Sequence, residues 1–336
     1  MRAQRFCYLI LAAGCVATAC SAQNVVGGPP PPAVRGAHAG TSGTFKQYTV
    51  PTETSEPYEI AAAGSTYWFT EKAADKVASV TTAGKFKEIP VKTGSAQPAG
   101  IAVAANGDVW FTELVGNKIG VVSTKGKITE FALKTPYAGP YRIAAGPDGN
   151  MWFTEYGVGQ IGRITPQGKI TEFALPEPTS APAGIASGPG GLWFCEELGH
   201  AVGLMDTTGK LVTTVTYKPK TSVPDDIVEG YDGAMWFTDY GDNAIDRIDS
   251  STYKIKQHAV PTKSSIPFII TQGPNKELWF TENAASRIGS ITTAGKVTEY
   301  PIPGSENTKV RGIASGSDGA LWFTEPGTNQ IGRYAP

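Results

Sequence analysis

The sequence is poor in cysteine, histidine and charge, and each shortage excludes a class of protein. Of the 336 residues four are cysteine, and Cys7, Cys15 and Cys20 lie at the start, so Cys195 has no partner for a disulfide in the rest of the chain. Three histidines leave no pair at the spacing of a metal motif, and no glycine-rich phosphate loop, serine nucleophile elbow or CxxC pair is present. Charged residues make up 18 % and the net charge is −1 without a basic block, which excludes binding of nucleic acid through its phosphates.

Residues 1–20 have the composition of an export signal. Two arginines precede a short apolar run at 6–13, which is too short to span a bilayer, and small residues follow. Residues 17–19 fit a signal-peptidase site, whereas Cys20 fits a lipoprotein site at which it would be acylated, and Cys15 is a third option. We therefore expect an exported protein that is periplasmic, extracellular or attached to the membrane of the cell envelope through lipidated Cys20.

Residues 21–43 contain consecutive glycines and prolines with few apolar side chains. Such a segment cannot bury enough surface to form a core, so we expect a disordered spacer. The remaining residues, 44–336, are expected to form one domain.

The seven tryptophans of the chain mark a repeat with a period in the low forties. Each is followed by Phe, then by Thr (Cys195 in the fourth copy) and then by Glu (Asp239 in the fifth). The tryptophans are Trp68, Trp110, Trp152, Trp193, Trp236, Trp279 and Trp322. Short apolar runs and glycine turns at this period predict an all-β fold, a seven-bladed β-propeller with one four-stranded blade per repeat.

The third repeat shows the expected order of strands within a blade. Alternation and turn residues predict an inner strand at 140–145, a second strand at 151–155, a third at 160–165 and an outer strand at 170–175. The last repeat stops after its third strand, and residues 44–51 have the pattern of an outer strand. We therefore expect the N-terminal strand to complete the last blade beside 329–334, which closes the ring, removes the open sheet edges and favours a monomer.

Residues that differ between repeats on the inner strands are the candidate site. The first two residues after the start of each inner strand include eight polar or aromatic side chains, which are Tyr58, Glu59, Tyr141, Arg142, Asp225, Asp226, Phe268 and Arg311. We expect them to surround the mouth of the central channel and to bind a ligand with carbonyl, hydroxyl or aromatic groups. The alternative is an ordinary solvated channel with ion pairs. Asp225 and Asp226 are adjacent on a strand and should point to opposite faces, so they are not expected to form an acid–base pair.

The acid that ends each motif occurs in every repeat, which favours a structural role. We expect these carboxylates to cap backbone N–H groups of the following turn or the next blade. The acids are Glu71, Glu113, Glu155, Glu196, Asp239, Glu282 and Glu325. The alternative is that one or two of them hold a hard cation such as Mg²⁺.

The Trp-Phe-Thr-Glu motif, followed by Asn/Gln-x-Ile-Gly-x-Ile and accompanied by Gly-Ile-Ala inner strands, resembles the virginiamycin B lyase (streptogramin B lyase) family over residues 44–336. The resemblance implies a seven-bladed propeller and a Mg²⁺-dependent elimination that opens the ester linkage of streptogramin B antibiotics. It also implies that Glu325 is a Mg²⁺ ligand. The family's second acid and general-base histidine fall at Lys309-Val310-Arg311, and a substrate-contacting histidine falls at Phe268. Arginine cannot act as a base near neutral pH, and Lys309 would repel a cation.

These departures leave three functions open. The first is binding of a small molecule, glycan or peptide at the channel mouth. The second is a Mg²⁺-dependent carbon–oxygen lyase that linearises streptogramin B-type cyclic depsipeptides. The third is a protein-interaction module of the cell envelope. Whether the chain is an enzyme stays open at this point.

Overall fold

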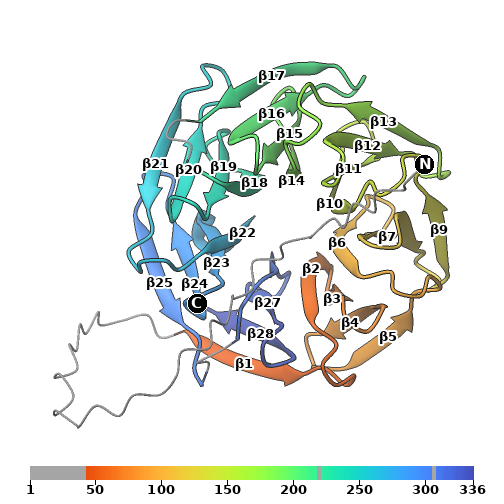
Figure 1. Ribbon diagram of the computed structural model, residues 1–336. Coiled ribbons are helices and arrows are strands. Elements are labelled where there is room, and N and C mark those ends of the chain that lie inside the picture. Colours follow the sequence, from red (N-terminus) through yellow and green to blue (C-terminus); the bar gives the residue numbers. More distant parts are fainter. Residues whose placement is uncertain (1–42, 218–220, 305–307) are drawn as a thin grey trace, which may run out of the picture. The chain divides into compact units, whose positions relative to one another are not determined.

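The computed structural model describes residues 43–217, 221–304 and 308–336. Within them the chain forms seven four-stranded antiparallel sheets, arranged as the blades of a ring (Figure 1). The only helix in this part of the chain is a short 3₁₀ turn, Pro274–Lys276, and no helix there is long and apolar enough to cross a membrane. The expected export signal at 1–20 and, apart from Gly43, the expected spacer at 21–43 lie outside the described residues.

Each blade runs from an inner strand to an outer strand in chain order, except the last. The inner strands are β2 (Pro57–Ala63), β6 (Pro98–Val103), β10 (Pro140–Ala145), β14 (Pro182–Gly188), β18 (Pro224–Glu229), β22 (Pro267–Gln272) and β26 (Ile313–Ser315). The motif strands are β3 (Thr66–Glu71), β7 (Val109–Glu113), β11 (Met151–Glu155), β15 (Gly191–Glu196), β19 (Met235–Asp239), β23 (Leu278–Glu282) and β27 (Leu321–Glu325). The third strands are β4 (Lys76–Thr81), β8 (Lys118–Val122), β12 (Gln160–Ile164), β16 (Ala201–Met205), β20 (Ala244–Ile248), β24 (Arg287–Ile291) and β28 (Gln330–Ala335). The outer strands are β5 (Phe86–Pro90), β9 (Ile128–Ala132), β13 (Ile170–Ala174), β17 (Leu211–Thr216), β21 (Ile255–Ala259), β25 (Val297–Pro301) and β1 (Thr44–Thr49).

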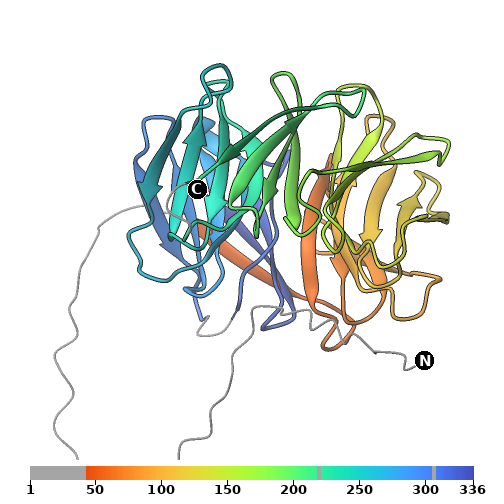
Figure 2. The ribbon, with the colours of Figure 1, turned by 45° about the horizontal axis from the view of Figure 1, so that its top comes forward.

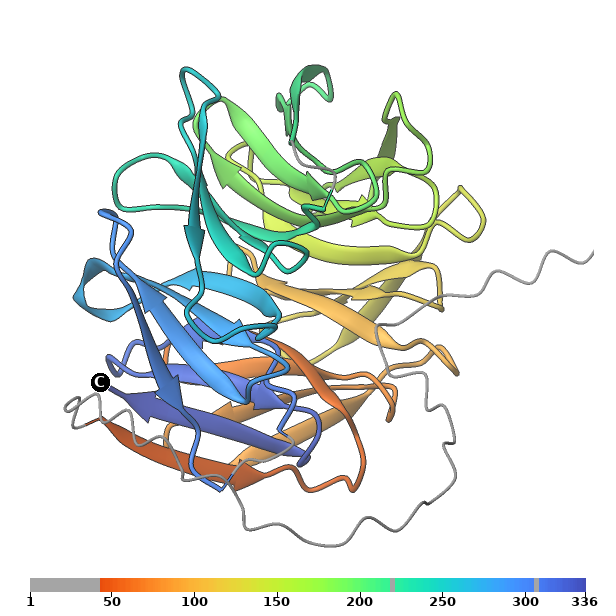
Figure 3. The same ribbon diagram turned by 60° about the vertical axis from the view of Figure 1, so that its left-hand side comes forward.

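The N-terminal strand closes the ring, which confirms the expectation from the sequence. β1 pairs antiparallel with β28, from Thr44 opposite Ala335 to Thr49 opposite Gln330. Figure 3 shows this first strand beside the last strands of the chain. The Phe45 and Tyr334 rings stack with centroids 4.4 Å apart, so the contact between the two ends includes side chains as well as the ladder.

The two aromatic residues of the motif fill the space between neighbouring sheets. In the third blade Phe153 is fully buried and lies on Gly162 of β12, where an added Cβ would come within 2.1 Å of the ring. The Trp152 ring stacks on Phe173 of the outer strand, 5.6 Å between centroids. The glycine of the third strand is therefore required because the phenylalanine occupies the space of a side chain.

The ring has two faces, which differ in the segments that form them (Figure 2). We call mouth face the one at which the inner strands begin, because the loops before these strands and the turns after the motif acids meet there. We call back face the opposite one, which carries the turns between first and second strands and those between third and outer strands. The inner strands thus lead from the mouth face to the back face.

A β-bulge interrupts the inner strand at the candidate site in six of the described blades. In the fifth blade, Pro224 lies opposite Asp239 and Ile227 lies opposite Phe237. An advance of three residues along β18 therefore corresponds to an advance of two residues along β19. In the other five blades the register between the inner strand and the motif strand shifts at the equivalent residues. A bulge interrupts the regular alternation of a strand, and it does so here at the level of the candidate site.

The motif threonine connects each blade to the next at the same level. In the third blade Thr154 Oγ1 accepts the N–H of Arg142 at 3.1 Å and donates to the carbonyl oxygen of Ala183 at 2.8 Å. The threonines of five other blades make the same two bonds. At the fourth blade Cys195 replaces the threonine, so this hydroxyl bridge between the fourth and fifth blades is missing.

Substitutions at these two positions should change stability in opposite directions. Thr154→Val leaves a buried N–H and a buried carbonyl without a partner and should lower the free energy of unfolding by about 2–4 kcal/mol. Cys195→Thr supplies the missing bridge and should raise it by about 1 kcal/mol. Urea unfolding measures both, and a neutral Thr154→Val would show that the bridge contributes nothing to stability.

Candidate functional site

The structure brings the predicted inner-strand residues together at the axis of the ring. The hydroxyl of Tyr141 lies 3.4 Å from that of Tyr58 and accepts a hydrogen bond of 2.6 Å from Arg311 Nη2. The guanidinium carbon of Arg311 also lies 3.6 Å from the ring centroid of Tyr58 and 4.1 Å from that of Phe268. Residues from the first, third, sixth and seventh blades thus contact one another directly. We call Tyr58, Tyr141, Asp225, Phe268 and Arg311 the floor of the mouth.

An ion-pair network also crosses the ring at the candidate site. Arg142 Nη1 lies 2.6 Å from Glu59 Oε1, and Nη2 lies 3.1 Å from Asp225 Oδ2. All three side chains are buried: their residues are 4 %, 7 % and 0 % exposed. One guanidinium therefore connects the first, third and fifth blades, and the charges are paired within the protein rather than solvated.

Glycines in the second, fourth and seventh blades make room for these charges. A Cβ at Gly100 would come within 2.4 Å of the Tyr141 carbonyl oxygen, and one at Gly184 within 2.6 Å of Asp226 Cα. A Cβ at Gly312 would come within 2.8 Å of Glu59 Cα. The blades that precede Arg142, Asp226 and Glu59 therefore have glycine at this level, which lets the next inner strand approach closely.

Burial changes the acidity of the site. It raises the pKa of Glu59 to about 7 and that of Asp226 to about 6, although Arg142 acts to lower both. Burial also raises the pKa of Asp225 well above its ordinary value, again against Arg142. Protonation of this cluster is therefore expected to change between mildly acidic and neutral pH.

A second set of residues lies around the floor, and the inner-strand pattern did not identify it. These residues directly follow the motif acids and include Lys72, Leu114, Tyr156, Glu197, Tyr240 and Asn283. We call them the rim. The rim residues differ between blades as strongly as the inner-strand residues do. This variation is the sequence signal that could have identified them.

The rim contacts the floor through aromatic rings and hydroxyl groups. Tyr156 packs edge-on against Tyr141, and Tyr240 stacks against Phe268. Both tyrosine hydroxyls donate to Glu197 Oε2, at 2.9 and 3.4 Å. The rim therefore presents aromatic faces and one carboxylate at the mouth.

Asp225 has the Glu197 carboxyl group as its acidic neighbour, whereas Asp225 and Asp226 do not pair with each other. The nearby Glu197 carboxyl group contributes to the raised pKa of Asp225. Asp226 instead accepts the backbone N–H of Ile270 in the next blade, at 3.0 Å. The adjacent aspartates thus have separate partners, and the carboxyl pair of the site joins two residues that are far apart in the repeat.

The motif acids have a different environment from the one expected. Within the described residues only Asp239 among them accepts backbone N–H groups, those of Val223 and Asp242. Glu155 is fully buried, and burial together with the charge of Glu172 on the outer strand raises its pKa to about 8. The same outer-strand neighbour occurs beside Glu71, Glu113 and Glu282. The expected backbone caps are therefore replaced in these blades by contact with a second carboxyl group.

Replacing one such glutamate should make stability less dependent on pH. The pKa of Glu155 is raised from 4.5 to about 8, so the folded protein holds a proton that the unfolded chain loses, and stability falls as pH rises from about 5 to 8. Glu155→Gln removes this loss and should raise the free energy of unfolding at pH 8 by at least about 1 kcal/mol, with little change at pH 4. Urea unfolding at the two pH values checks this, and Glu177→Gln, at an exposed loop position, is the matched control. An equal effect at both pH values would contradict the assigned protonation.

Glu325, the expected Mg²⁺ ligand, is hydrogen-bonded to the N-terminal strand. Both carboxylate oxygens accept hydrogen bonds from Gln47 Nε2 on the outermost strand, at 3.2 and 2.9 Å. Among the described residues no group of three or more His, Cys, Asp or Glu side chains is placed to hold a metal ion. Mg²⁺ at Glu325 therefore stays a prediction that this geometry does not favour.

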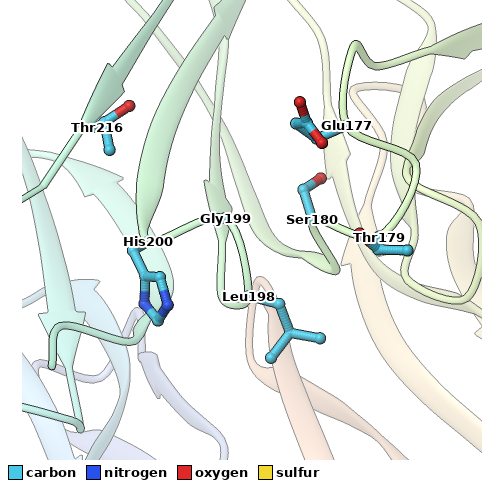
Figure 4. Close-up of a pocket in the computed structure, with 7 residues that line it drawn as sticks. All are labelled: Glu177, Thr179, Ser180, Leu198, Gly199, His200 and Thr216. Carbon is cyan, nitrogen blue, oxygen red and sulfur yellow. The ribbon is translucent and has the colours of Figure 1, made fainter. Parts of the chain in front are cut away.

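Two cavities in the described part of the chain lie away from the floor. One, of about 270 Å³, is bounded by the loop with Glu177 and Ser180 on one side and by Leu198 and His200 on the other (Figure 4). His200 Nδ1 lies 2.6 Å from the carbonyl oxygen of Ser222, which fixes the ring. The other cavity, of about 350 Å³, lies against β17 and β21. Neither contains any of the eight predicted residues.

Comparison with known proteins agrees with this architecture. Residues 34–192 and 189–336 match the Virginiamycin B lyase family. The solved structure of virginiamycin B lyase from Staphylococcus aureus is 34 % identical, with 88 % of this chain and 99 % of that chain covered and a TM-score of 0.83. A streptogramin B lyase structure is 38 % identical, with 87 % and 97 % covered and a TM-score of 0.82.

A third solved structure shows a catalytically inactive variant of the Staphylococcus aureus enzyme, in which one histidine is replaced by alanine, with quinupristin. It is 33 % identical, with 88 % and 99 % covered and a TM-score of 0.83. A search of curated proteins finds no match. The family match covers far more than half of the sequence, and the alignments span nearly the whole of the related structures. The chain therefore belongs to the virginiamycin B lyase family.

Proposed function

We propose that this protein binds a small-molecule, glycan or peptide ligand at the mouth of the ring. The observation that carries the proposal is the environment of Arg311. Its guanidinium lies over two aromatic rings and bonds to a tyrosine hydroxyl, yet the residue is still partly exposed. A guanidinium fixed in this way loses little freedom when it binds a carbonyl or carboxylate group.

The surroundings of Arg311 favour a ligand of peptide character. Phe268, Tyr156 and Tyr240 are partly exposed and supply aromatic faces, and Asn283 adds a neutral polar group to the rim. Floor side chains fill the axis at this level, so the ligand would rest on the floor and contact the rim. The solved relative with quinupristin makes a cyclic depsipeptide the natural probe.

Substitution of Arg311 tests binding directly. Arg311→Ala removes a charge-assisted hydrogen bond and should raise the Kd for quinupristin about 10- to 100-fold by calorimetry. Arg311→Lys keeps the charge but loses the planar fork and should recover only part of the affinity. Arg287→Ala, on the third strand of the sixth blade, is the matched control and should leave the Kd unchanged. Absence of binding by the unaltered protein would contradict a depsipeptide ligand.

The carboxyl pair of Glu197 and Asp225 supports a second candidate, a lyase that acts by proton transfer. Burial raises the pKa of Asp225, so its carboxyl group holds a proton more strongly than an ordinary aspartate does, and an elimination requires such a proton-transfer group. Here Asp225→Asn should abolish turnover while leaving binding measurable. Incubation with quinupristin and Mg²⁺, with linear product detected by chromatography and fragmentation because elimination leaves the mass unchanged, distinguishes the two candidates. Product at a catalytic rate would favour the lyase.

A further inference from the structure

The back face of the ring carries a circle of exposed lysines. In six blades the turn between the third and the outer strand places one lysine at its end, and all six are exposed. These residues are Lys85, Lys127, Lys169, Lys210, Lys254 and Lys296. We call them the lysine circle.

The turns themselves do not require lysine side chains. The backbone N–H of Lys85 donates to Thr81 Oγ1 at 3.2 Å, and that of Lys210 donates to Asp206 Oδ1 at 3.0 Å. Three other turns use the same backbone bond. In the part of the chain that the structure describes, no ammonium group of the circle takes part in an ion pair. The positive charges are therefore free to meet an external partner.

Four acidic groups of the back face have partners within their own blades. Asp206 and Asp249 accept N–H groups of the residues that follow them. Asp232 and Asp318 pair with Arg247 and Arg333, at 2.7 and 2.9 Å. Within the described residues none of these four carboxylates forms an ion pair with an ammonium group of the circle.

The chain joins the ring on the back face. Thr44 begins β1 opposite Ala335, at the end of β28 that lies away from the mouth. An N-terminal attachment of the kind expected at Cys20 would therefore connect to the ring on the side of the lysine circle.

We propose that the back face binds an anionic lipid surface through the lysine circle, with the mouth directed away from the membrane. Each lysine near such a surface strengthens binding about fivefold, and the attraction falls off within a Debye length. Six charges distributed around the axis would orient the plane of the propeller parallel to the membrane surface. This proposal does not depend on what the mouth binds.

Binding to vesicles tests the proposal without the lipid anchor. The full chain with Cys20→Ser is mixed with vesicles of phosphatidylcholine, with or without phosphatidylglycerol, and sedimented. We expect binding only to the anionic vesicles, and a decrease as salt is raised. Lys127→Gln, Lys169→Gln and Lys210→Gln together should weaken binding about 100-fold.

The matched control removes three lysines from the mouth face, by Lys92→Gln, Lys134→Gln and Lys263→Gln. It changes the net charge equally and should weaken binding less than about threefold. Surface substitutions of this kind leave stability nearly unchanged, and the melting temperature verifies folding of both variants. Equal losses in both variants, or no binding to anionic vesicles at low salt, would overturn the proposal. Binding to soluble polyphosphate but not to vesicles would also overturn it, in favour of an anionic polymer.

Discussion

Deletion of residues 44–49 is expected to leave the protein largely unfolded. The deletion removes the whole β1–β28 ladder, the stack of Phe45 on Tyr334 and that of Tyr48 on Trp322. Loss of a packed aromatic residue costs about 3–5 kcal/mol, and two such losses approach the total stability of an ordinary domain. Far-UV circular dichroism and thermal melting of the purified variant measure the effect.

The equivalent contact within a continuous blade supplies the control. Phe173 occupies the place of Tyr48 and stacks on Trp152, so Phe173→Ala removes one ring without opening the circle of blades. We expect this variant to melt at a lower temperature but to fold, whereas the deletion variant does not. Addition of a synthetic peptide with the sequence of residues 43–51 should restore part of the structure. A deletion variant with an unchanged melting temperature would disprove the role of this strand in closure.

Arg142→Met should lower the free energy of unfolding by about 3–5 kcal/mol at pH 8, because it leaves Glu59 and Asp225 buried without their cation. The loss should shrink toward pH 4. Glu59 has its pKa raised from 4.5 to about 7, so below about pH 4.5 it is protonated in both states and needs no partner. The Arg142 guanidinium lowers the pKa of Glu59, so this pKa should be higher in the variant than in the unaltered protein. The pH range over which the stability of the variant falls should therefore extend to higher pH. Urea unfolding across this pH range checks both statements.

Two further variants separate the charge effect from a loss of packing. Arg163→Met removes an arginine that lies over the Trp152 ring but holds no buried acid, and should cost less than about 1 kcal/mol. The triple variant Arg142→Met, Glu59→Gln, Asp225→Asn should regain much of the lost stability at pH 8, because no buried charge remains unpaired. If the single variant is equally destabilised at pH 4 and pH 8, the ion-pair account is wrong.

The fold was predictable because its determinants repeat along the chain. The tryptophans gave the number of blades, the period gave their size, and the resemblance of residues 44–51 to residues 169–176 gave the closing strand. What the sequence concealed was the bulge at the start of the inner strands. Alternation predicts that Asp225 and Asp226 face opposite ways, and an inserted residue in the ladder follows from three-dimensional pairing rather than from composition.

The inner-strand residues of the candidate site were predictable from the sequence, whereas the rim residues and the pairing were not. All eight residues lie at the mouth level, where Arg142 holds Glu59 and Asp225 from two other blades. Whether Arg142 reaches acids on other blades depends on the diameter of the central channel, and no local sequence pattern encodes that distance. The same limit applies to Glu155, whose neighbour Glu172 comes near it only when the blade folds.

The pairing of β1 with β28 also determines when the protein can be completed during biosynthesis. Thr44–Thr49 is made first, and its partner Gln330–Ala335 is made after all the intervening blades. Until then the nascent circle stays open, with two unsatisfied edges that are able to recruit strands from other molecules. A chain that ends before Gln330 therefore contains most of the blade strands but lacks the partner of Thr44–Thr49 and cannot close the ring.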